Sequence, residues 1–224
     1  LFLSKLWLAE VTPYYEDESC TIYHGDCREV LPGLQVGDQL CPTDPPYGIG
    51  LNNDWQDAVH RSPNTGRGGL IGDVPESVGG YVEVCRSFAR RVVLGFPYLL
   101  DERAGGWLVW DKEPGFSGRS LTSPIEMAYS TTWTGFRCER LLWSGYMRTH
   151  DAEPKYGHPT QKPERLMRSI LGRHEDAAVL DPFMGGGTTL RAAKDLGRKA
   201  IGIEIEERYC EIAAKRLAQE VLAL

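Results

Sequence analysis

Two short segments of this 224-residue sequence contain residue types at spacings that can do chemistry. The first is DPFMGGGTT, residues 181–189, where three glycines stand between an apolar strand pattern and a helix pattern. Glycines at such a junction let a ligand approach the backbone, and the N-terminus of the following helix favours polar or anionic groups. Glu204 ends the next strand pattern, 19 residues after Gly185, where a carboxylate can accept hydrogen bonds from ribose hydroxyls. The segment therefore predicts a nucleoside-binding site.

Two details of this glycine segment narrow the kind of ligand. No lysine follows the glycines as a Walker phosphate loop requires, and Leu190 occupies the third glycine position of the dinucleotide fingerprint. The bland alternative is a glycine turn that only packs a helix against a strand.

The second segment is Asp44-Pro45-Pro46-Tyr47. Consecutive prolines remove two backbone donors and fix the backbone, so the carboxylate and the ring are held in a rigid corner. If the substrate is the exocyclic amine of a base, Asp44 and the Pro45 carbonyl can accept both amine hydrogens and localise the nitrogen lone pair. Tyr47 can then stack on the extruded base. The alternative is a plain Pro-Pro turn with an exposed tyrosine.

The elements that must position these segments alternate between strand and helix patterns. We expect strands at 21–24, 38–43, 91–96, 106–111, 178–180 and 200–205. We expect helices at 28–34, 81–90, 163–171, 190–196 and 206–222, with Gly197 as a C-cap. Residues 125–146 suggest the start of a helix followed by strands around Trp133 and 141–143. This alternation predicts one α/β domain with a doubly wound, largely parallel sheet, and both segments at adjacent carboxyl ends of its strands.

Composition and charge exclude several other classes of protein. The hydrophobic fraction of 42% and charged fraction of 25% fit one globular domain, and no apolar run reaches the ~20 residues of a membrane span. The net charge is −6, which argues against a non-specific nucleic-acid binder but leaves room for a local basic groove. The six cysteines form no C-x-x-C pair, which favours reduced thiols and a cytoplasmic location.

The first ten residues differ in composition from the segment that follows them. Residues 1–10 are apolar and precede an acidic stretch, and we read them as a non-native or upstream extension, with the domain at 11–224. The alternative is a short amphipathic helix whose leucines pack on the domain.

Taken together, the motifs resemble one family. GDCREVLPGL, TDPPYG, GGWLVWDK, HPTQKPERLM, DPFMGGGTT and GIEIEERY are similar to S-adenosylmethionine-dependent DNA amino-methyltransferases of the N6-adenine/N4-cytosine type. Their order is that of the permuted subgroup with DPPY before the cofactor motif, over about residues 20–220. The resemblance implies a Rossmann-like methyltransferase fold and S-adenosylmethionine as cofactor. It implies no metal, because the sulfonium supplies its own leaving group and catalysis is mostly in-line positioning.

The resemblance also assigns roles to residues. Asp44 and Pro45 hold the target amine in the Pro46-containing corner, and Tyr47 stacks on the base. Glu204 binds the cofactor ribose, Asp26 and Cys27 lie by its adenine, and residues 158–163 pack against its methionine end. The residues assigned to the cofactor are Asp26, Cys27, His158, Thr160, Lys162, Pro163, Asp181, Pro182, Phe183, Gly185, Gly187, Thr188, Thr189 and Glu204.

Two features depart from the family pattern. Pro42 stands in an expected central strand, where proline is unwelcome, so we expect that strand to be short or irregular. No separate target-recognition domain is visible, so recognition of double-stranded DNA falls on the long loop 48–75 and on 137–165. The candidate DNA-binding residues are Arg61, Asn64, Arg67, Arg148 and Lys155, whose alternative is ordinary surface charge.

Several other functions compete with this interpretation. A nicotinamide-dependent oxidoreductase shares the glycine turn and the ribose acid but gives no reason for the DPPY segment. A methyltransferase of RNA or protein more often resembles Asn-Pro-Pro-Tyr, and a catalytically silent nucleic-acid-binding relative has intact motifs against it. Asp44 favours adenine N6 as the target, since relatives that modify cytosine N4 more often resemble Ser-Pro-Pro-Tyr. The recognition sequence, a restriction partner and the oligomeric state, with a homodimer as one arrangement, are left open.

Overall fold

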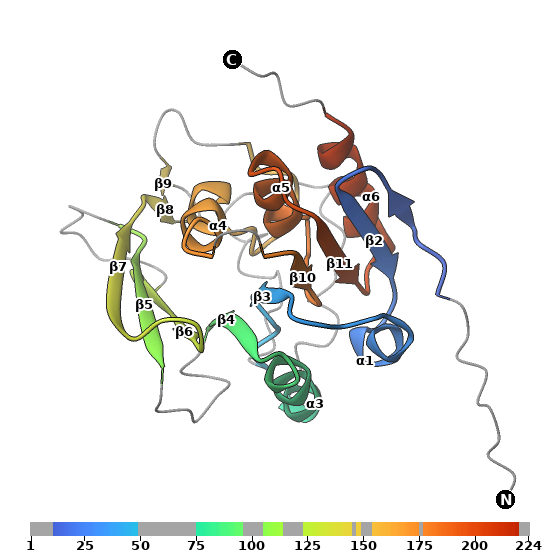
Figure 1. Cartoon of the computed structure of the whole chain (residues 1–224). Helices are drawn as coiled ribbons and strands as arrows, with labels where there is room; N and C mark the ends of the chain where they lie inside the picture. Colours follow the sequence, from blue (N-terminus) through green and yellow to red (C-terminus); the bar gives the residue numbers. More distant parts are fainter. Residues whose placement is uncertain are drawn as a thin grey trace, which may run out of the picture.

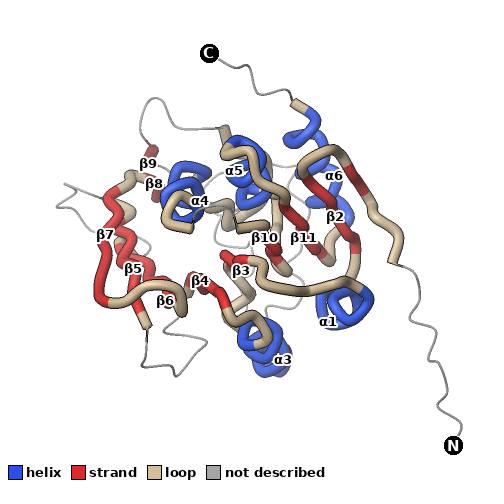
Figure 2. The backbone as a smooth tube through the Cα atoms, in the orientation of Figure 1, coloured by secondary structure: helices blue, strands red, loops and turns tan. Residues whose placement is uncertain are grey.

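The computed structural model describes residues 11–48, 75–95, 105–113, 123–144, 147–148, 154–174 and 177–219. These residues form a nine-stranded sheet in the order β1-β2-β11-β10-β3-β4-β6-β5-β7, and a separate hairpin of β8 and β9. Helices cover both faces: α4, α5 and α6 lie on one side, and α1 and α3 lie on the other (Figures 1 and 2). The α/β fold predicted from the sequence is therefore confirmed.

The bounds of the elements are as follows. The strands are β1 Tyr15–Glu16, β2 Cys20–His24, β3 Leu40–Thr43, β4 Arg90–Leu94, β5 Gly106–Asp111, β6 Ile125–Ser130, β7 Gly135–Arg140, β8 Trp143–Ser144, β9 Met147–Arg148, β10 Val179–Asp181 and β11 Ala200–Glu204. The helices are α1 Cys27–Val30, a 3₁₀ turn at Leu31–Gly33, α3 Pro75–Arg86, α4 Glu164–Leu171, α5 Thr188–Asp195 and α6 Glu207–Ala218.

The sheet is largely parallel, as predicted. Strands β2, β11, β10, β3 and β4 run parallel to one another. Strand β6 is antiparallel to both β4 and β5, and β7 pairs in parallel with β5 at one edge. Antiparallel β1 closes the opposite edge.

The expected helix start within 125–146 is wrong. Residues Ile125–Ser130 form β6, which pairs on both sides, with β4 and with β5. Ala128 and Tyr129 are buried there, so tertiary pairing decides the conformation of a segment whose local pattern is ambiguous. Trp133 lies in the turn between β6 and β7 rather than in a strand.

Two other element boundaries differ from the expectation. Helix α3 begins at Pro75 rather than near 81, because proline is tolerated in the first turn of a helix. Gly80 in that helix has the side chain of Arg28 against it, so a small residue fits where α3 meets α1. Helix α6 ends at Ala218, within the predicted 206–222. Residues 1–10 and positions 49–74 of the predicted DNA-facing loop lie outside the described residues.

Strand β3 accommodates Pro42 by giving up its ladder to β10. The amide of Leu40 donates to the carbonyl of Ala178 at 2.9 Å, and the next amide of β3 that would face β10 belongs to residue 42. Proline has no such donor, and the β3–β10 register holds only the pair Val179–Leu40. Pairing with β4 continues through Thr43. The backbone ladder between these two central strands therefore stops before their carboxyl ends, where both motifs begin.

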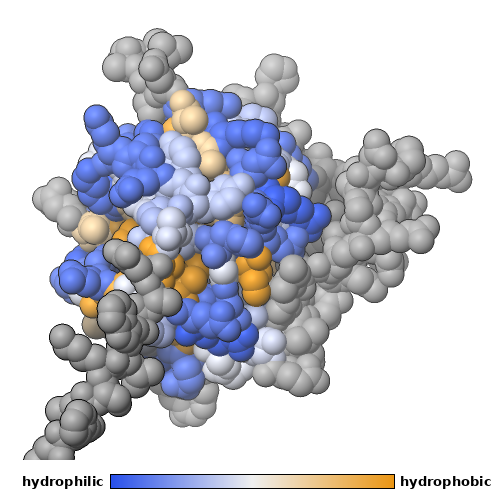
Figure 3. All heavy atoms as spheres, turned by 90° about the vertical axis from the view of Figure 1, so that its right-hand side faces the viewer, coloured by the Kyte–Doolittle hydropathy of each residue, from blue (hydrophilic) through white to orange (hydrophobic). Residues whose placement is uncertain are grey.

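The core is built from the buried faces of the central strands and of the helices that cover them. Ile22, Leu40, Val179 and Leu190 are each fully buried. The face of the molecule in Figure 3 is mostly hydrophilic, with apolar side chains in small patches among charged ones. No helix in the described part of the chain is both long and apolar enough to cross a membrane.

Candidate active site

The two motifs meet at the ends of adjacent strands. Strand β3 leads into Asp44 and strand β10 ends at Asp181, and the hydroxyl of Thr43 donates to the Asp181 carboxylate at 2.7 Å. Asp181 also accepts the amide of Phe183 at 3.1 Å and a hydrogen bond from Thr189. Burial raises the pKa of Asp181 to about 6 despite these donors. The juxtaposition predicted from the sequence is present.

Asp44 is the centre of a compact charged cluster. Both the Lys162 ammonium and the Tyr47 hydroxyl donate to its carboxylate. Lys162 Nζ also lies 3.1 Å from Glu126 Oε1 in β6, and Lys112 Nζ lies 3.8 Å from Glu126 Oε2. The cluster contains two carboxylates, two ammonium groups and one phenol.

Burial and neighbouring charge act in opposite directions on this cluster. Burial raises the pKa of Asp44 and Glu126 raises it further, while Lys162 lowers it. Burial lowers the pKa of Lys162, but Asp44 and Glu126 outweigh burial and raise it above its usual value. Lys162 therefore stays an ammonium in the site.

The Tyr47 ring lies against Gly95, which directly follows β4. A Cβ atom at Gly95 would stand 2.0 Å from a ring carbon of Tyr47, and Gly95 has a φ of +70°. Only glycine accepts both conditions without strain. The Tyr47 hydroxyl reaches Glu126 Oε1 at 3.4 Å as well as Asp44. Stacking of this ring on a base stays a prediction.

The glycine segment is held by the ribose-binding candidate. Gly185 donates its amide to Glu204 Oε2 at 3.0 Å, and Glu206 donates its amide to Glu204 Oε1 at 2.8 Å. Each carboxylate oxygen keeps further acceptor capacity beyond these bonds. Burial raises the pKa of Glu204 to about 7.

Two glycines of the segment are required by packing. A Cβ atom at Gly185, where φ is +51°, would stand 2.9 Å from His158 Nε2. A Cβ atom at Gly187 would stand 2.7 Å from Ala213 Cβ, so Gly187 lets α5 approach α6. The alternative interpretation, in which the glycines only allow close packing, thus accounts for part of the glycine run. Gly187 serves helix packing.

His158 is neutral in this environment. Burial, together with the positive charges of Lys162 and Arg208, lowers its pKa to about 3. The Thr160 amide lies 3.3 Å from Nδ1, which therefore accepts a hydrogen bond and leaves the proton on Nε2. The imidazole also lies 4.3 Å from the Tyr209 ring, between centroids. Loop 158–163 thus presents a neutral imidazole to Gly185 and an ammonium, Lys162, to Asp44.

The residues expected by the cofactor adenine are connected to the glycine segment through Phe183. Asp26 caps α1 by accepting the amide of Arg28 at 2.9 Å and forms an ion pair with the same residue. The Arg28 guanidinium lies 5.3 Å from the centre of the Tyr81 ring, which meets Phe183 edge to face at 5.1 Å. Cys27 and Phe183 pack in one apolar cluster.

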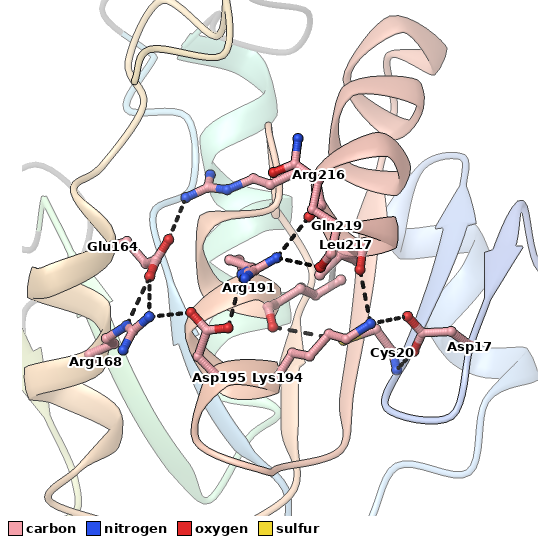
Figure 4. A network of polar contacts seen from close by, with 11 residues as sticks. Asp17, Cys20, Glu164, Arg168, Arg191, Lys194, Asp195, Arg216, Leu217 and Gln219 are labelled. Carbon is pink, nitrogen blue, oxygen red and sulfur yellow. Dashed lines mark hydrogen bonds and ion pairs between the residues drawn. The ribbon is translucent and has the colours of Figure 1, made fainter. Parts of the chain in front are cut away.

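A polar network beside the glycine segment ties α4, α5 and α6 together (Figure 4). The fully buried Arg216 donates to Thr188 Oγ1 at 3.0 Å and to Glu164 Oε2 at 3.1 Å. Glu164 also accepts from Arg168, which in turn reaches Asp195. Thr188 and Thr189 therefore have their side chains engaged within the protein, with Arg216 and Asp181 respectively.

The remaining predicted site residues lie in several different places. Pro182 lies between Asp181 and Phe183, and Pro163 is the N-cap residue of α4. Of the DNA-binding candidates, Arg61, Asn64 and Arg67 lie outside the described residues. Arg148 is described by its backbone in β9, and Lys155 is exposed.

Sequence reasoning missed several contributors to the site. Lys112 ends the GGWLVWDK motif, but its spacing did not reveal its charge partner. Gln161 binds the loop together by accepting the Tyr156 amide at 2.7 Å and donating to the Pro154 carbonyl at 3.1 Å. Glu126 belongs to the segment expected to start a helix, and no sequence signal marks it.

Comparisons with known proteins agree with the family resemblance of the motifs. Residues 108–215 match the family model N6_N4_Mtase, described as DNA methylase. This part of the chain matches DNA methylases. The matched range contains the Lys162 loop, the glycine segment and Glu204, while Asp44 precedes it. The predicted amino-methyltransferase family is confirmed.

Individual relatives extend the match beyond the methylase domain. The chain is 27% identical to type II methyltransferase M.ScaI of Streptomyces caespitosus over 284 aligned residues, which cover 95% of this chain and 86% of that protein. Two solved structures share the fold. PvuII DNA methyltransferase (cytosine-N4-specific) has a TM-score of 0.59 at 17% identity and covers 94% of this chain and 90% of its own. The M1.HpyAVI–SAM complex has a TM-score of 0.55 at 22% identity and covers 89% and 100%.

Proposed function

We propose that this protein transfers a methyl group from S-adenosylmethionine to the exocyclic amine of a base in double-stranded DNA, with adenine N6 as the favoured target. The observation that carries the proposal is the junction of the two motifs. Asp44 and the glycine segment follow adjacent strand ends, and the Thr43–Asp181 bond of 2.7 Å ties those ends together. Methyl transfer requires donor and acceptor sites in near contact, which this arrangement supports.

The side chains around the glycine segment fit the proposed cofactor chemically. Glu204 is a buried carboxylate with acceptor capacity left for two ribose hydroxyls. Phe183 and Cys27 offer an apolar surface beside the Asp26 carboxylate, which suits an adenine ring and its amino group. The neutral His158 lies beside Gly185, and Thr160 donates its amide to that imidazole. S-Adenosylmethionine, when bound, supplies a methyl group on a sulfonium that is its own leaving group.

The residues of the DPPY corner orient the nucleophile. The Asp44 carboxylate and the Pro45 carbonyl accept the two hydrogens of the target amine, which directs the nitrogen lone pair away from the base ring. The nitrogen forms its bond to the methyl carbon as the carbon–sulfur bond breaks. The nitrogen then holds one proton too many, and Asp44 is the acceptor beside it.

The target base has two candidates. Asp44 in the DPPY motif favours adenine N6. Cytosine N4 is the second candidate, supported by the likeness in fold to the cytosine-N4-specific PvuII enzyme. Both bases present an amine beside a ring nitrogen, so the same two acceptors serve either one.

The experiment that tests the function is nucleoside analysis. DNA incubated with the protein and S-adenosylmethionine is digested to nucleosides and weighed by mass spectrometry, with Asp44→Ala as the negative control. We expect N6-methyladenine from the wild type and none from the variant. N4-methylcytosine without N6-methyladenine would show that cytosine is the target base and would leave the proposed mechanism unchanged. Methylation only of RNA or protein supplied in parallel would contradict the assignment of DNA as substrate.

Two finer points of the proposal concern the protein in the cell. We expect a cytoplasmic protein, because its cysteine pattern favours reduced thiols. A homodimer is the assembly to test, by light scattering after size-exclusion chromatography. Long-read sequencing of DNA from an expressing, methylation-deficient host would give the recognition sequence.

A further inference from the structure

Both oxygens of the Asp44 carboxylate accept hydrogen bonds from protein groups. Its Oδ1 accepts from the Tyr47 hydroxyl and its Oδ2 accepts from Lys162. An amine that donates to Asp44 therefore competes with one of these partners for the carboxylate. Tyr47 is confined by Gly95, whereas Lys162 has a flexible four-carbon stem.

Glu126 offers the Lys162 ammonium a second ion-pair partner. Lys162 Nζ lies 3.1 Å from Glu126 Oε1 while it contacts Asp44. The exposed fractions of the three side chains are 13% for Lys162, 20% for Asp44 and 17% for Glu126, so water screens these charges weakly. An ammonium held between two carboxylates can leave one of them without becoming an unpaired buried charge.

The charge balance of the cluster depends on Lys162. The groups that face Asp44 are Tyr47, Lys162, Glu126 and Asp181, with Lys112 behind Glu126. Without the Lys162 charge, three carboxylates would share the site with Lys112 as the remaining cation of this set. Carboxylates that share a buried site cannot all ionise, and a protonated Asp44 cannot accept both an amine hydrogen and the released proton.

We propose that Lys162 and Glu126 are positioning residues for Asp44: Lys162 keeps Asp44 a carboxylate and moves onto Glu126 when the substrate amine takes its place. This inference rests on the proposed function and names how its acceptor is prepared. The proton balance closes, because the amine nitrogen passes its proton to Asp44 as the Lys162–Glu126 pair remains neutral. Asp44 releases that proton to water when the product leaves, and Lys162 returns.

The first test reads Asp44 directly, without DNA or cofactor. Protein labelled with ¹³C at aspartate carboxyl carbons is titrated by NMR, and the Asp44 signal is assigned from its loss in Asp44→Asn. We expect Lys162→Met to raise the Asp44 midpoint by about one to three pH units, the effect of removing a nearby opposite charge. Lys162→Arg keeps the charge and should leave the midpoint near that of the wild type. Glu126→Gln should lower the midpoint, because Glu126 raises the pKa of Asp44.

A matched control comes from a similar ion pair far from the site. Lys194 lies 2.6 Å from Asp17, with exposed fractions of 22% and 21%, between α5 and the β1–β2 turn. Lys194→Met makes the same chemical change in a pair of similar burial. It should leave the Asp44 midpoint unmoved. An equal rise in Lys194→Met would attribute the effect to loss of folding and overturn the proposal.

The second test is the pH dependence of methyl transfer at saturating cofactor. In Lys162→Met the acid limb should move to higher pH and the rate should recover at alkaline pH. In Glu126→Gln the acid limb should move to lower pH, while the plateau falls because Lys162 has lost its alternative partner. If Lys162 and Glu126 had purely structural roles, the acid limbs of the two variants would not move in opposite directions.

The outcomes separate this proposal from the proposed function. A wild type that methylates no DNA, with opposite shifts of the Asp44 midpoint in the two variants, rejects the function and leaves the coupling of the cluster standing. Methylation with an Asp44 midpoint that Lys162→Met does not move rejects the role of Lys162. Shifts in the same direction, or an unchanged plateau in Glu126→Gln, reject the handover to Glu126.

Discussion

The hydroxyl of Thr43 donates a 2.7 Å hydrogen bond to the Asp181 carboxylate, and this bond joins the ends of β3 and β10 where Pro42 has ended their ladder. Thr43 is fully buried and Asp181 is 2% exposed. A side-chain bond thus replaces the backbone bond that proline cannot make. The substrate corner and the cofactor segment are held together at that point.

Thr43→Val should destabilise the protein by about 1–3 kcal/mol, the cost of leaving a buried acceptor without a donor. The pKa of Asp181 is about 6 in the folded protein and 3.8 ordinarily. Ionisation of Asp181 therefore lowers the free energy of unfolding as the pH rises from 3.8 to about 6. Valine raises that pKa further, so urea unfolding should show a larger cost at pH 8 than at pH 5. Ser123→Ala, which removes an exposed hydroxyl bonded to the Ile125 carbonyl, is the control and should show a small, pH-independent cost.

Glu204→Ala should weaken binding of S-adenosylmethionine by about 1.5–3 kcal/mol, as expected for hydrogen bonds to a charged group. The pKa of Glu204 is raised to about 7, and the ionised form is the better acceptor for hydroxyls. Isothermal titration should therefore show tighter binding to the wild type as pH rises through 7, and Glu204→Gln should lose that dependence. Asp44→Ala should leave cofactor binding nearly intact, and the reverse pattern in these variants would contradict the assignment of the two pockets.

Gly95→Ala should impair the DPPY corner by displacing the Tyr47 ring. The new Cβ atom would stand 2.0 Å from that ring, and the φ of +70° costs a further ~1–2 kcal/mol in a non-glycine residue. In the Tyr47→Ala background the Gly95→Ala substitution loses the steric cost of the clash with the ring, and only the cost of the backbone conformation remains. Denaturation of the four proteins of this cycle measures the difference, and additive costs would show that Tyr47 lies elsewhere.

Arg216→Met should cost about 3 kcal/mol, near the lower end for breaking a buried ion pair. The lower end applies because Glu164 keeps its contact with Arg168, 2.7 Å away. Lys215→Met is the matched control on the same helix, since its pair with Glu211 is exposed and should contribute less than ~1 kcal/mol. Equal losses of stability in the two variants would refute the importance of the Thr188–Arg216–Glu164 connection.

The sequence alone determined the elements that have strong local patterns. The strand 106–111 is found as predicted, and Gly197 has the left-handed φ of +70° expected of a C-cap. The rule that ligands bind at the carboxyl ends of parallel strands predicts Asp44 and Asp181 at adjacent strand ends, and the sheet order confirms this. Such features follow from neighbouring residues in the chain and from general rules of parallel sheets.

Only the tertiary structure decided the partners of these residues. Glu126 reaches Lys162 because β6 inserts antiparallel between β4 and β5, and the local pattern of residues 125–130 does not distinguish that strand from a helix. Lys162 was expected by the cofactor from its place in a motif, yet its ammonium pairs with Asp44, 118 residues away in sequence. The physical reason is that buried charges must find opposite charges, and the closest ones are set by how strands cross the sheet rather than by spacing along the chain.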